Sequence, residues 1–203
     1  MAVTTESPIP VIGCEGLVLF PVKTDTKEKL ETDDENLIDL SECMVGKTYT
    51  PQVVEGAFYA SNKKAVAIKM NKGGTLSLVI PSLSEELKQK ILGAKVNEQG
   101  ITVLGVDDVS PEFIVAFKTN KTNKVTTLEK YGKVVFSTPT ETANTQGENI
   151  DFQTAEITGE IIPIVHTKGQ FQFTCDSTNE KYAELEKVWS TKGTAGIIAN
   201  TVV

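Results

Sequence analysis

The sequence is poor in the residues on which most enzymes and metal sites depend. Among 203 residues there is one histidine, His166, and there are three cysteines, Cys14, Cys43 and Cys175. The cysteines are far apart and show no CxxC spacing, so they cannot form a zinc site from local ligands and are expected to be reduced thiols. No GxSxG motif accompanies the histidine. We therefore expect no enzymatic activity, cofactor or metal, although 27 acidic residues leave a carboxylate pair of the glycosidase type open.

Long apolar runs and an excess of positive charge are also missing. No stretch approaches the roughly 18 apolar residues of a membrane span, and the N-terminal residues lack the basic and apolar regions of a secretory signal. Twenty Lys+Arg stand against 27 Asp+Glu, which gives a formal charge of -7. Proteins that grip DNA need clustered Lys and Arg, and this chain repels polyanions instead. We expect a protein made in the cytoplasm that binds neither membranes nor DNA specifically.

What the sequence does contain is a series of short apolar segments separated by turn residues. Its length is that of one domain with a sizeable core. The Gly73-Gly74 pair predicts a hairpin turn between two of the segments, and Gly132 predicts a bulge. The expected fold is mainly β, with two packed antiparallel sheets in a sandwich or partial barrel. Strands are predicted at 14–22, 65–70, 75–80, 101–106, 113–119, 125–136, 152–165 and 170–175.

Two amphipathic helices are predicted among the strands. The first flanks the sheet at 82–93, where Ser82 and Glu85 form a capping box and Gly93 ends the helix. The second begins with another capping pair, Ser177 and Glu180, and places Tyr182, Leu185, Val188 and Trp189 on one side.

Two further segments are unlike the rest of the chain. Residues 23–50 are predicted to leave the core as a long acidic loop or hairpin arm, because connections of this length in a compact domain are uncommon. A solvated loop that keeps the protein soluble is the alternative. Residues 191–203 form an apolar C-terminal arm that is expected to pair within the chain or with a neighbour. The candidate inter-subunit or lumen-facing residues are Asp25, Glu28, Glu31, Asp33, Asp34, Glu35, Asp39, Glu42, Ile197, Ile198, Val202 and Val203.

One motif imitates a nucleotide-binding loop. Ser41-Glu-Cys-Met-Val-Gly46-Lys47-Thr48 ends in Gly-Lys-Thr, but Ser41 occupies the position where a P-loop requires glycine. Tyr49-Thr50-Pro51 is also a poor start for the helix that would point at the phosphates. A turn between two extended segments is therefore the favoured interpretation.

Four stretches of the chain resemble the major tail proteins that build the tail tube of long-tailed, non-contractile bacteriophages. They are 12–20, a strand that looks like the family's opening strand; 76–93, a strand feeding a helix; 113–119 together with 131–136; and 148–159. Their order and spacing carry the resemblance, and none is a chemical motif. The acidic segment before Gly46 and the residues after Lys192 depart from the family pattern.

The resemblance implies a tail-tube fold and a structural role in the virion. Six subunits would close into a ring through strand pairing, and rings would stack into a hollow tube that conducts double-stranded DNA without binding it specifically. Tape measure, tail terminator and distal tail proteins would be partners. Three alternatives remain: the tube of a phage-derived bacteriocin or secretion device, a monomeric β-sandwich binding module, and a nucleotide-dependent enzyme using Gly46-Lys47-Thr48.

Overall fold

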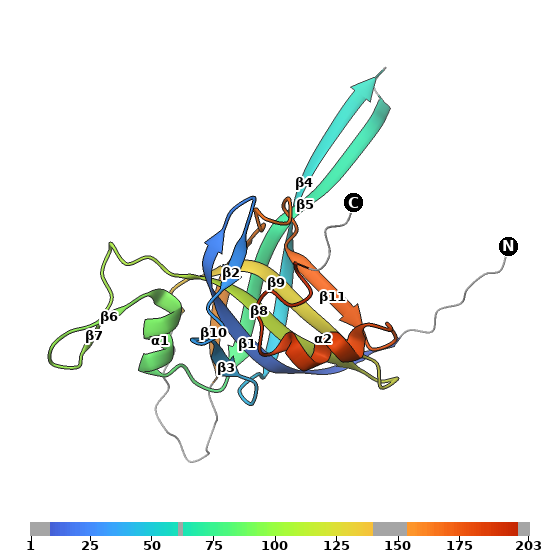
Figure 1. Ribbon diagram of the computed structural model, residues 1–203. Coiled ribbons are helices and arrows are strands. Elements are labelled where there is room, and N and C mark those ends of the chain that lie inside the picture. Colours follow the sequence, from blue (N-terminus) through green and yellow to red (C-terminus); the bar gives the residue numbers. More distant parts are fainter. Residues whose placement is uncertain (1–8, 61–62, 140–153, 199–203) are drawn as a thin grey trace, which may run out of the picture.

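The structure is a computed structural model that describes residues 9–60, 63–139 and 154–198 (Figure 1). Every strand pair within these ranges is antiparallel, which confirms the predicted mainly β class. In chain order the elements are β1 (Val11–Asp25), β2 (Leu30–Thr32), β3 (Ile38–Leu40), β4 (Gly46–Ala60), β5 (Lys63–Ile80), α1 (Glu85–Leu92), β6 (Lys95–Val96), β7 (Thr102–Val103), β8 (Glu112–Lys121), β9 (Thr126–Phe136), β10 (Ala155–Ile162), β11 (Gln172–Asp176) and α2 (Tyr182–Trp189).

The body is built on one curled sheet in place of the two separate sheets that form a sandwich. Its hydrogen-bonded order is β2-β1-β8-β9-β10-β5-β4, with β3 added to β1 and β11 added to β9. In a flat sheet β4 and β8 would lie about 19 Å apart, at about 4.8 Å a strand. Here Lys47 Nζ of β4 is 4.4 Å from the ring centre of Phe117 on β8. The sheet must therefore curl until its ends face each other, which agrees with the partial-barrel form of the prediction.

The inner face of the curl holds the larger core. Leu17, Leu76 and Phe117 come from three different strands and are completely buried. Helix α1 adds Leu87, Ile91 and Leu92 to this core, as its predicted apolar side requires. The helix ends at Gly93 in the left-handed conformation, as predicted, but its N-cap is Ser84. The predicted Ser82–Glu85 capping box is wrong by two residues, because the Ser84 side chain accepts a hydrogen bond from the Leu87 N–H.

A second core covers the outer face of β1, β8 and β9. Phe20, Ile114 and Leu128 point outward from the three strands, and Trp189 of α2 packs over them with Ile164 and Ile197. Helix α2 confirms the predicted second helix, although Lys181 is its N-cap and makes no side-chain capping bond there. Because both faces of these strands are buried, β1 and β8 contain continuous apolar runs at 17–20 and 113–117. Strand β9 instead buries three charged side chains, Glu129, Lys130 and Lys133.

Glycines act differently at two places in the sheet. Gly132 lies at a register shift, since Ile114 pairs with Lys133 and Val115 with Tyr131; the predicted bulge is confirmed. The predicted hairpin turn at Gly73-Gly74 is wrong. Both glycines lie inside β5, which continues unbroken from Lys63 to Ile80. The strand predicted at 101–106 is reduced to β7, which forms a two-stranded ribbon with β6.

Candidate functional site

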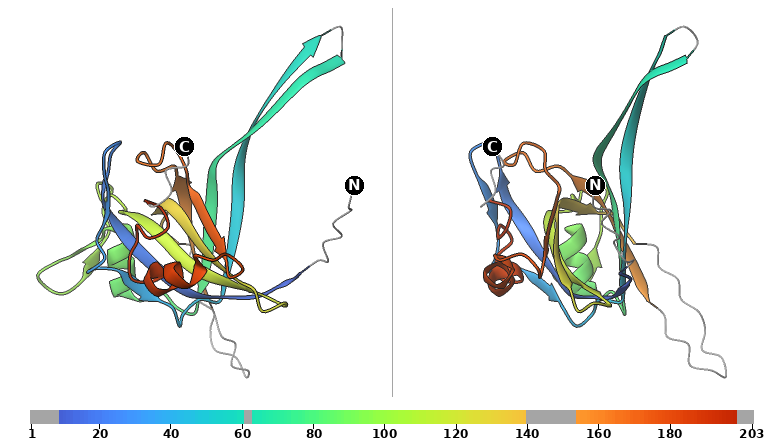
Figure 2. Two further views of the ribbon diagram at one scale, coloured as in Figure 1. Left: turned by 45° about the vertical axis from the view of Figure 1, so that its right-hand side comes forward. Right: turned by 90° about the vertical axis from the view of Figure 1, so that its right-hand side faces the viewer.

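A two-stranded ribbon extends out of the body (Figure 1). Strands β4 and β5 pair along their whole length, and their lower halves belong to the curled sheet. Their upper parts, residues 53–60 and 63–71, extend away from every other element, as both views in Figure 2 show. We call these residues the arm. At about 3.3 Å a residue, the eight residues 53–60 correspond to a length of about 26 Å.

The arm leaves the body at a bend that only glycine permits. Gly73 and Gly74 have φ values of 123° and 154°, and a Cβ on Gly74 would lie 2.2 Å from the Thr50 carbonyl oxygen. Across the ribbon, the register of β4 shifts between Pro51 and Val53. The Tyr49 hydroxyl donates to the Gly73 carbonyl at 3.0 Å and fixes the base of the arm. The two glycines thus direct the ribbon away from the sheet instead of ending it.

The two faces of the arm differ in chemistry. Cross-strand partners share a face and alternate along the strands, so Val54 and Met70 lie on the same side as Ile68 and Val66. These four side chains are between 42% and 55% exposed. On the opposite face, Glu55 and Lys69 form an ion pair. The arm therefore presents one apolar face that no described part of the chain covers.

A second exposed apolar surface lies between α1 and β8. It comprises residues 95–109, which we call the β6–β7 patch. The exposed fraction of its large apolar side chains ranges from 48% at Val103 to 101% at Val106. The apolar members are Val96, Ile101, Val103, Leu104, Val106 and Val109. In Figure 1 this ribbon and the arm project from different sides of the body.

The acidic segment is not the arm that the sequence predicted. Strand β2 pairs with the end of β1, and β3 pairs with its middle through Leu17 and Leu40. Leu30 and Ile38 are buried, one in each core. These apolar side chains hold residues 23–50 along the edge of the sheet, so the prediction of a long excursion is wrong. The projecting arm begins only after this segment.

Several of the candidate acidic residues are bound within the subunit. The Asp25 side chain is 3% exposed and contacts Lys133 Nζ at 3.1 Å. Asp33 pairs with Lys23 at 3.0 Å, and Asp34 accepts the Gly193 N–H at 3.0 Å. A lumen-facing or inter-subunit role is wrong for Asp25, since its carboxylate is enclosed. The more open carboxylates keep such a role as a prediction; they are Glu28, Glu31, Glu35, Asp39 and Glu42.

The C-terminal segment folds onto its own subunit. The buried ammonium of Lys130 donates to the carbonyl oxygens of Lys192 at 2.7 Å, Gly193 at 3.2 Å and Ala195 at 3.0 Å. Ile197 is 1% exposed in the outer core, so its predicted contact with a neighbouring subunit is wrong. Ile198 is 45% exposed. Val202 and Val203 lie outside the described residues.

Lys130 is also the strongest electrostatic anomaly of the described chain. Its ammonium lies 4.4 Å from the ring centre of Trp189 and 5.4 Å from that of Phe20. Burial lowers the pKa of Lys130 to about 7, and the nearby carboxylate of Asp34 only partly opposes this effect. Lys130 is completely buried, and its three hydrogen bonds hold residues 192–195 against the sheet. It is a structural anchor, which a lone lysine in a strand does not reveal by sequence.

In the segment that resembles a P-loop, the lysine forms an ion pair within the subunit. Gly46-Lys47-Thr48 opens β4, so the helix that a P-loop requires is replaced by a strand. Lys47 Nζ contacts Glu129 at 2.6 Å, and Glu129 also accepts the Thr119 hydroxyl at 2.5 Å. Burial raises the pKa of the neighbouring Tyr131, and the charge of Glu129 raises it further. The contacts among Lys47, Glu129 and Thr119 hold β4 against β8 and β9.

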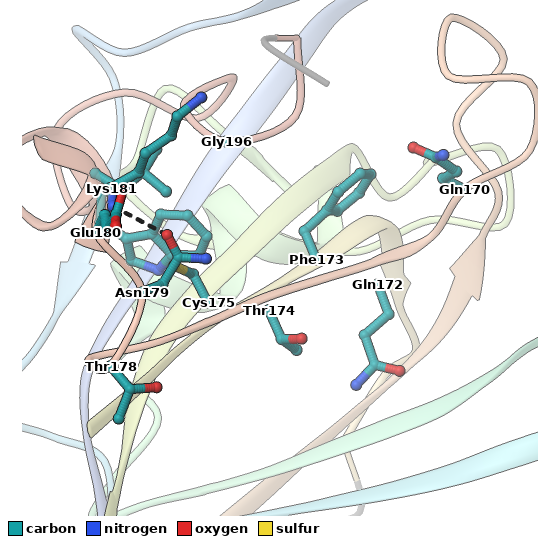
Figure 3. Close-up of a pocket in the computed structure, with 12 residues that line it drawn as sticks. Gln170, Gln172, Phe173, Thr174, Cys175, Thr178, Asn179, Glu180, Lys181 and Gly196 are labelled. Atoms are coloured by element: carbon teal, nitrogen blue, oxygen red, sulfur yellow. Dashed lines mark hydrogen bonds between the residues drawn. The ribbon is translucent and has the colours of Figure 1, made fainter. Parts of the chain in front are cut away.

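A surface hollow lies beside α2. It has a volume of about 910 Å³ and is open to solvent. Figure 3 shows Gln172 and Thr174 on one side of β11 and Phe173 on the other. The Asn179 side chain, which also lines the hollow, accepts the Lys181 N–H at 2.9 Å. The lining offers amides, hydroxyls and the half-buried ring of Phe173, together with the side chains of Cys175, Glu180 and Lys181.

No protein-family model matches this chain, and no curated protein is significantly similar to it.

Within the described ranges, no group of three or more His, Cys, Asp or Glu side chains is placed to hold a metal ion. No helix of those residues is long and apolar enough to cross a membrane.

Proposed function

We propose that this protein is a structural subunit of the tail tube of a long-tailed, non-contractile bacteriophage. One observation carries the proposal: the arm exposes an apolar face, and the described part of the chain leaves this face uncovered. A two-stranded ribbon is only marginally stable in water, and clustered apolar side chains on a surface usually mark a protein contact. In the assembled tube, a neighbouring subunit would cover the apolar face of the arm.

The resemblance of the sequence to tail tube proteins suggests which assembly this contact would build. Six subunits would form a ring and rings would stack into a conduit for DNA, with no catalytic role for any residue. The formal charge of -7 supports this use, because an acidic wall offers phosphates nothing to bind. The tape measure, tail terminator and distal tail proteins belong to the same proposal, as does the location in the virion tail.

Adjacent residues on opposite faces of the arm provide a matched test. Ile68→Lys places a charge on the apolar face, whereas Ala67→Lys places the same charge on the exposed opposite face. We expect Ile68→Lys to remain folded but to lose assembly in sedimentation velocity, and Ala67→Lys to assemble like the unaltered protein. Equal assembly by both variants would show that the apolar face is not an interface.

A monomeric binding module is the second candidate, and the hollow beside α2 is the observation that favours it. Its amide and hydroxyl lining could hydrogen-bond to a sugar or a peptide. This candidate predicts a monomer at every concentration in sedimentation velocity. The tube of a bacteriocin or secretion device would use the same subunit contacts as a phage tail, so it is a variant of the first proposal.

A further inference from the structure

The arm and the β6–β7 patch are complementary in charge as well as in polarity. By sequence, residues 53–71 contain three lysines against one glutamate, while residues 95–109 contain three acidic residues against one lysine. The arm is thus a basic projection on an acidic protein. Within the patch, Asp108 pairs with Lys95 at 3.3 Å, which leaves Glu98 and Asp107 as its excess negative charge.

We propose that the apolar face of the arm of one subunit packs on the β6–β7 patch of the next copy of the chain. This inference rests on the proposed function and names the surface that covers the arm. Both surfaces are apolar at the centre and opposite in charge, which is the arrangement that favours one partner over others. The patch has six exposed apolar side chains to set against Val54, Val66, Ile68 and Met70 of the arm.

The contact must be between different molecules and must repeat. The arm and the patch project from different sides of one body, so a subunit cannot close the contact on itself (Figures 1 and 2). Because the two surfaces differ, each copy binds one neighbour through its arm and a second neighbour through its patch. Such head-to-tail contacts form closed rings or open stacks instead of stopping at a dimer. The length of the arm lets it reach past the edge of its own body.

Duplex DNA is a less suitable occupant for this face. Among the arm residues whose side chains are described, Lys69 already pairs with Glu55, and both lie on the face opposite to Ile68. The apolar face itself places valine, isoleucine and methionine where a phosphate would need cations. An apolar surface of another protein molecule satisfies these side chains, and the basic character of the arm guides it toward an acidic patch.

Cysteine cross-linking tests the pairing directly. In a Cys43→Ser background, which removes the exposed native thiol, we combine Ile68→Cys with Val103→Cys and treat concentrated protein with a short bismaleimide. We expect a ladder of covalent dimers, trimers and longer species in the double variant and no ladder in either single variant. Ala67→Cys with Val103→Cys is the matched control on the other face of the arm, and we expect a yield several times lower.

Each other outcome overturns the inference in a recognisable way. Rings or tubes in electron micrographs without a 68–103 ladder would reject this pairing while leaving the tail-tube proposal intact. Covalent dimers from Ile68→Cys alone would mean that arms pair with arms. A shift of fluorescent duplex DNA that Ile68→Glu abolishes and Ala67→Glu retains would make DNA the occupant of the arm's apolar face. Protein that stays monomeric at every concentration would reject both the pairing and the proposed function.

Discussion

Lys130 and Lys192 are joined by a hydrogen bond of 2.7 Å from the buried ammonium of the first to the backbone carbonyl of the second. This contact links the centre of β9 to the segment that follows α2. It explains why the C-terminal residues up to Ile197 stay on their own subunit, although their apolar sequence predicted an arm. Gly193 reinforces the link by donating its N–H to Asp34 at 3.0 Å.

Trp189 should report the protonation of Lys130. The protein has one tryptophan, and its ring centre is 4.4 Å from the Lys130 ammonium. With a pKa of about 7, the loss of the cation should change the emission of Trp189 near neutral pH. Lys130→Met should abolish this transition. An emission profile that is flat between about pH 6 and 9 in the unaltered protein would contradict the lowered pKa.

The same lysine should make stability depend on pH. The pKa of Lys130 falls from 10.5 to about 7 on folding, so between these values the unfolded chain binds more protons than the folded one. The free energy of unfolding should therefore rise with pH above 7, by up to about 1.4 kcal/mol per pH unit from this group. Urea denaturation at several pH values measures the slope, and the difference between the unaltered protein and Lys130→Met isolates the lysine. A difference that does not change with pH would contradict this prediction.

Asp25 should be worth more to stability than its exposed neighbours. Burial acts to raise the pKa of Asp25, but the N–H groups of Val165 and His166 and the ammonium of Lys133 lower it below its usual value. The stabilisation is present at neutral pH and is lost as the pH falls through that lowered pKa. Asp25→Ala should lower the free energy of unfolding by about 2–4 kcal/mol, because it leaves Lys133 partly unpaired.

Glu28 is the matched control for Asp25, since it lies on the same segment and is exposed. Glu28→Ala should change the free energy of unfolding in urea by no more than about 0.5 kcal/mol. Similar losses from both variants would mean that the end of β1 and the residues after it contribute through their backbone and not through the Asp25 carboxylate.

Lys47 should matter for stability and not for nucleotides. Lys47→Ala removes the partner of Glu129, whose side chain is 11% exposed, and should cost about 1–3 kcal/mol in urea denaturation. Thr48→Ala removes only an exposed hydroxyl and should be nearly neutral. We expect no heat of MgATP binding in calorimetry from either variant or from the unaltered protein. Binding that both substitutions abolish would restore the P-loop hypothesis.

Local signals in the sequence predicted much of the body. Gly93 ends α1 because it adopts the left-handed conformation, which glycine takes without a steric penalty, and Gly132 marks the register shift of β9. The alternation of Phe171, Phe173 and Cys175 with polar residues predicted the half-buried strand β11 correctly. These features depend on neighbours a few residues away, which is the range that periodicity and turn chemistry describe.

The features that define the candidate site depend on contacts between distant residues. Gly73 and Gly74 look like a turn, but the carbonyls of Ile161 and Thr50 close against them and make them a bend within one strand. The ribbon of β4 and β5 had a weaker signal in the sequence, the alternation of Val66, Ile68 and Met70 with Ala67 and Lys69. From the sequence, residues 23–50 were predicted to leave the core because their charged side chains outnumber their apolar ones. Leu30 and Ile38 are nevertheless buried in the two cores and hold the segment on the body.

Negative-stain electron microscopy of the concentrated protein tests the central claim most directly. The account predicts six-membered rings or hollow tubes, and predicts that Ile68→Lys removes them while Ala67→Lys retains them. A field of single particles the size of one subunit, unchanged at every concentration and in both variants, would contradict it.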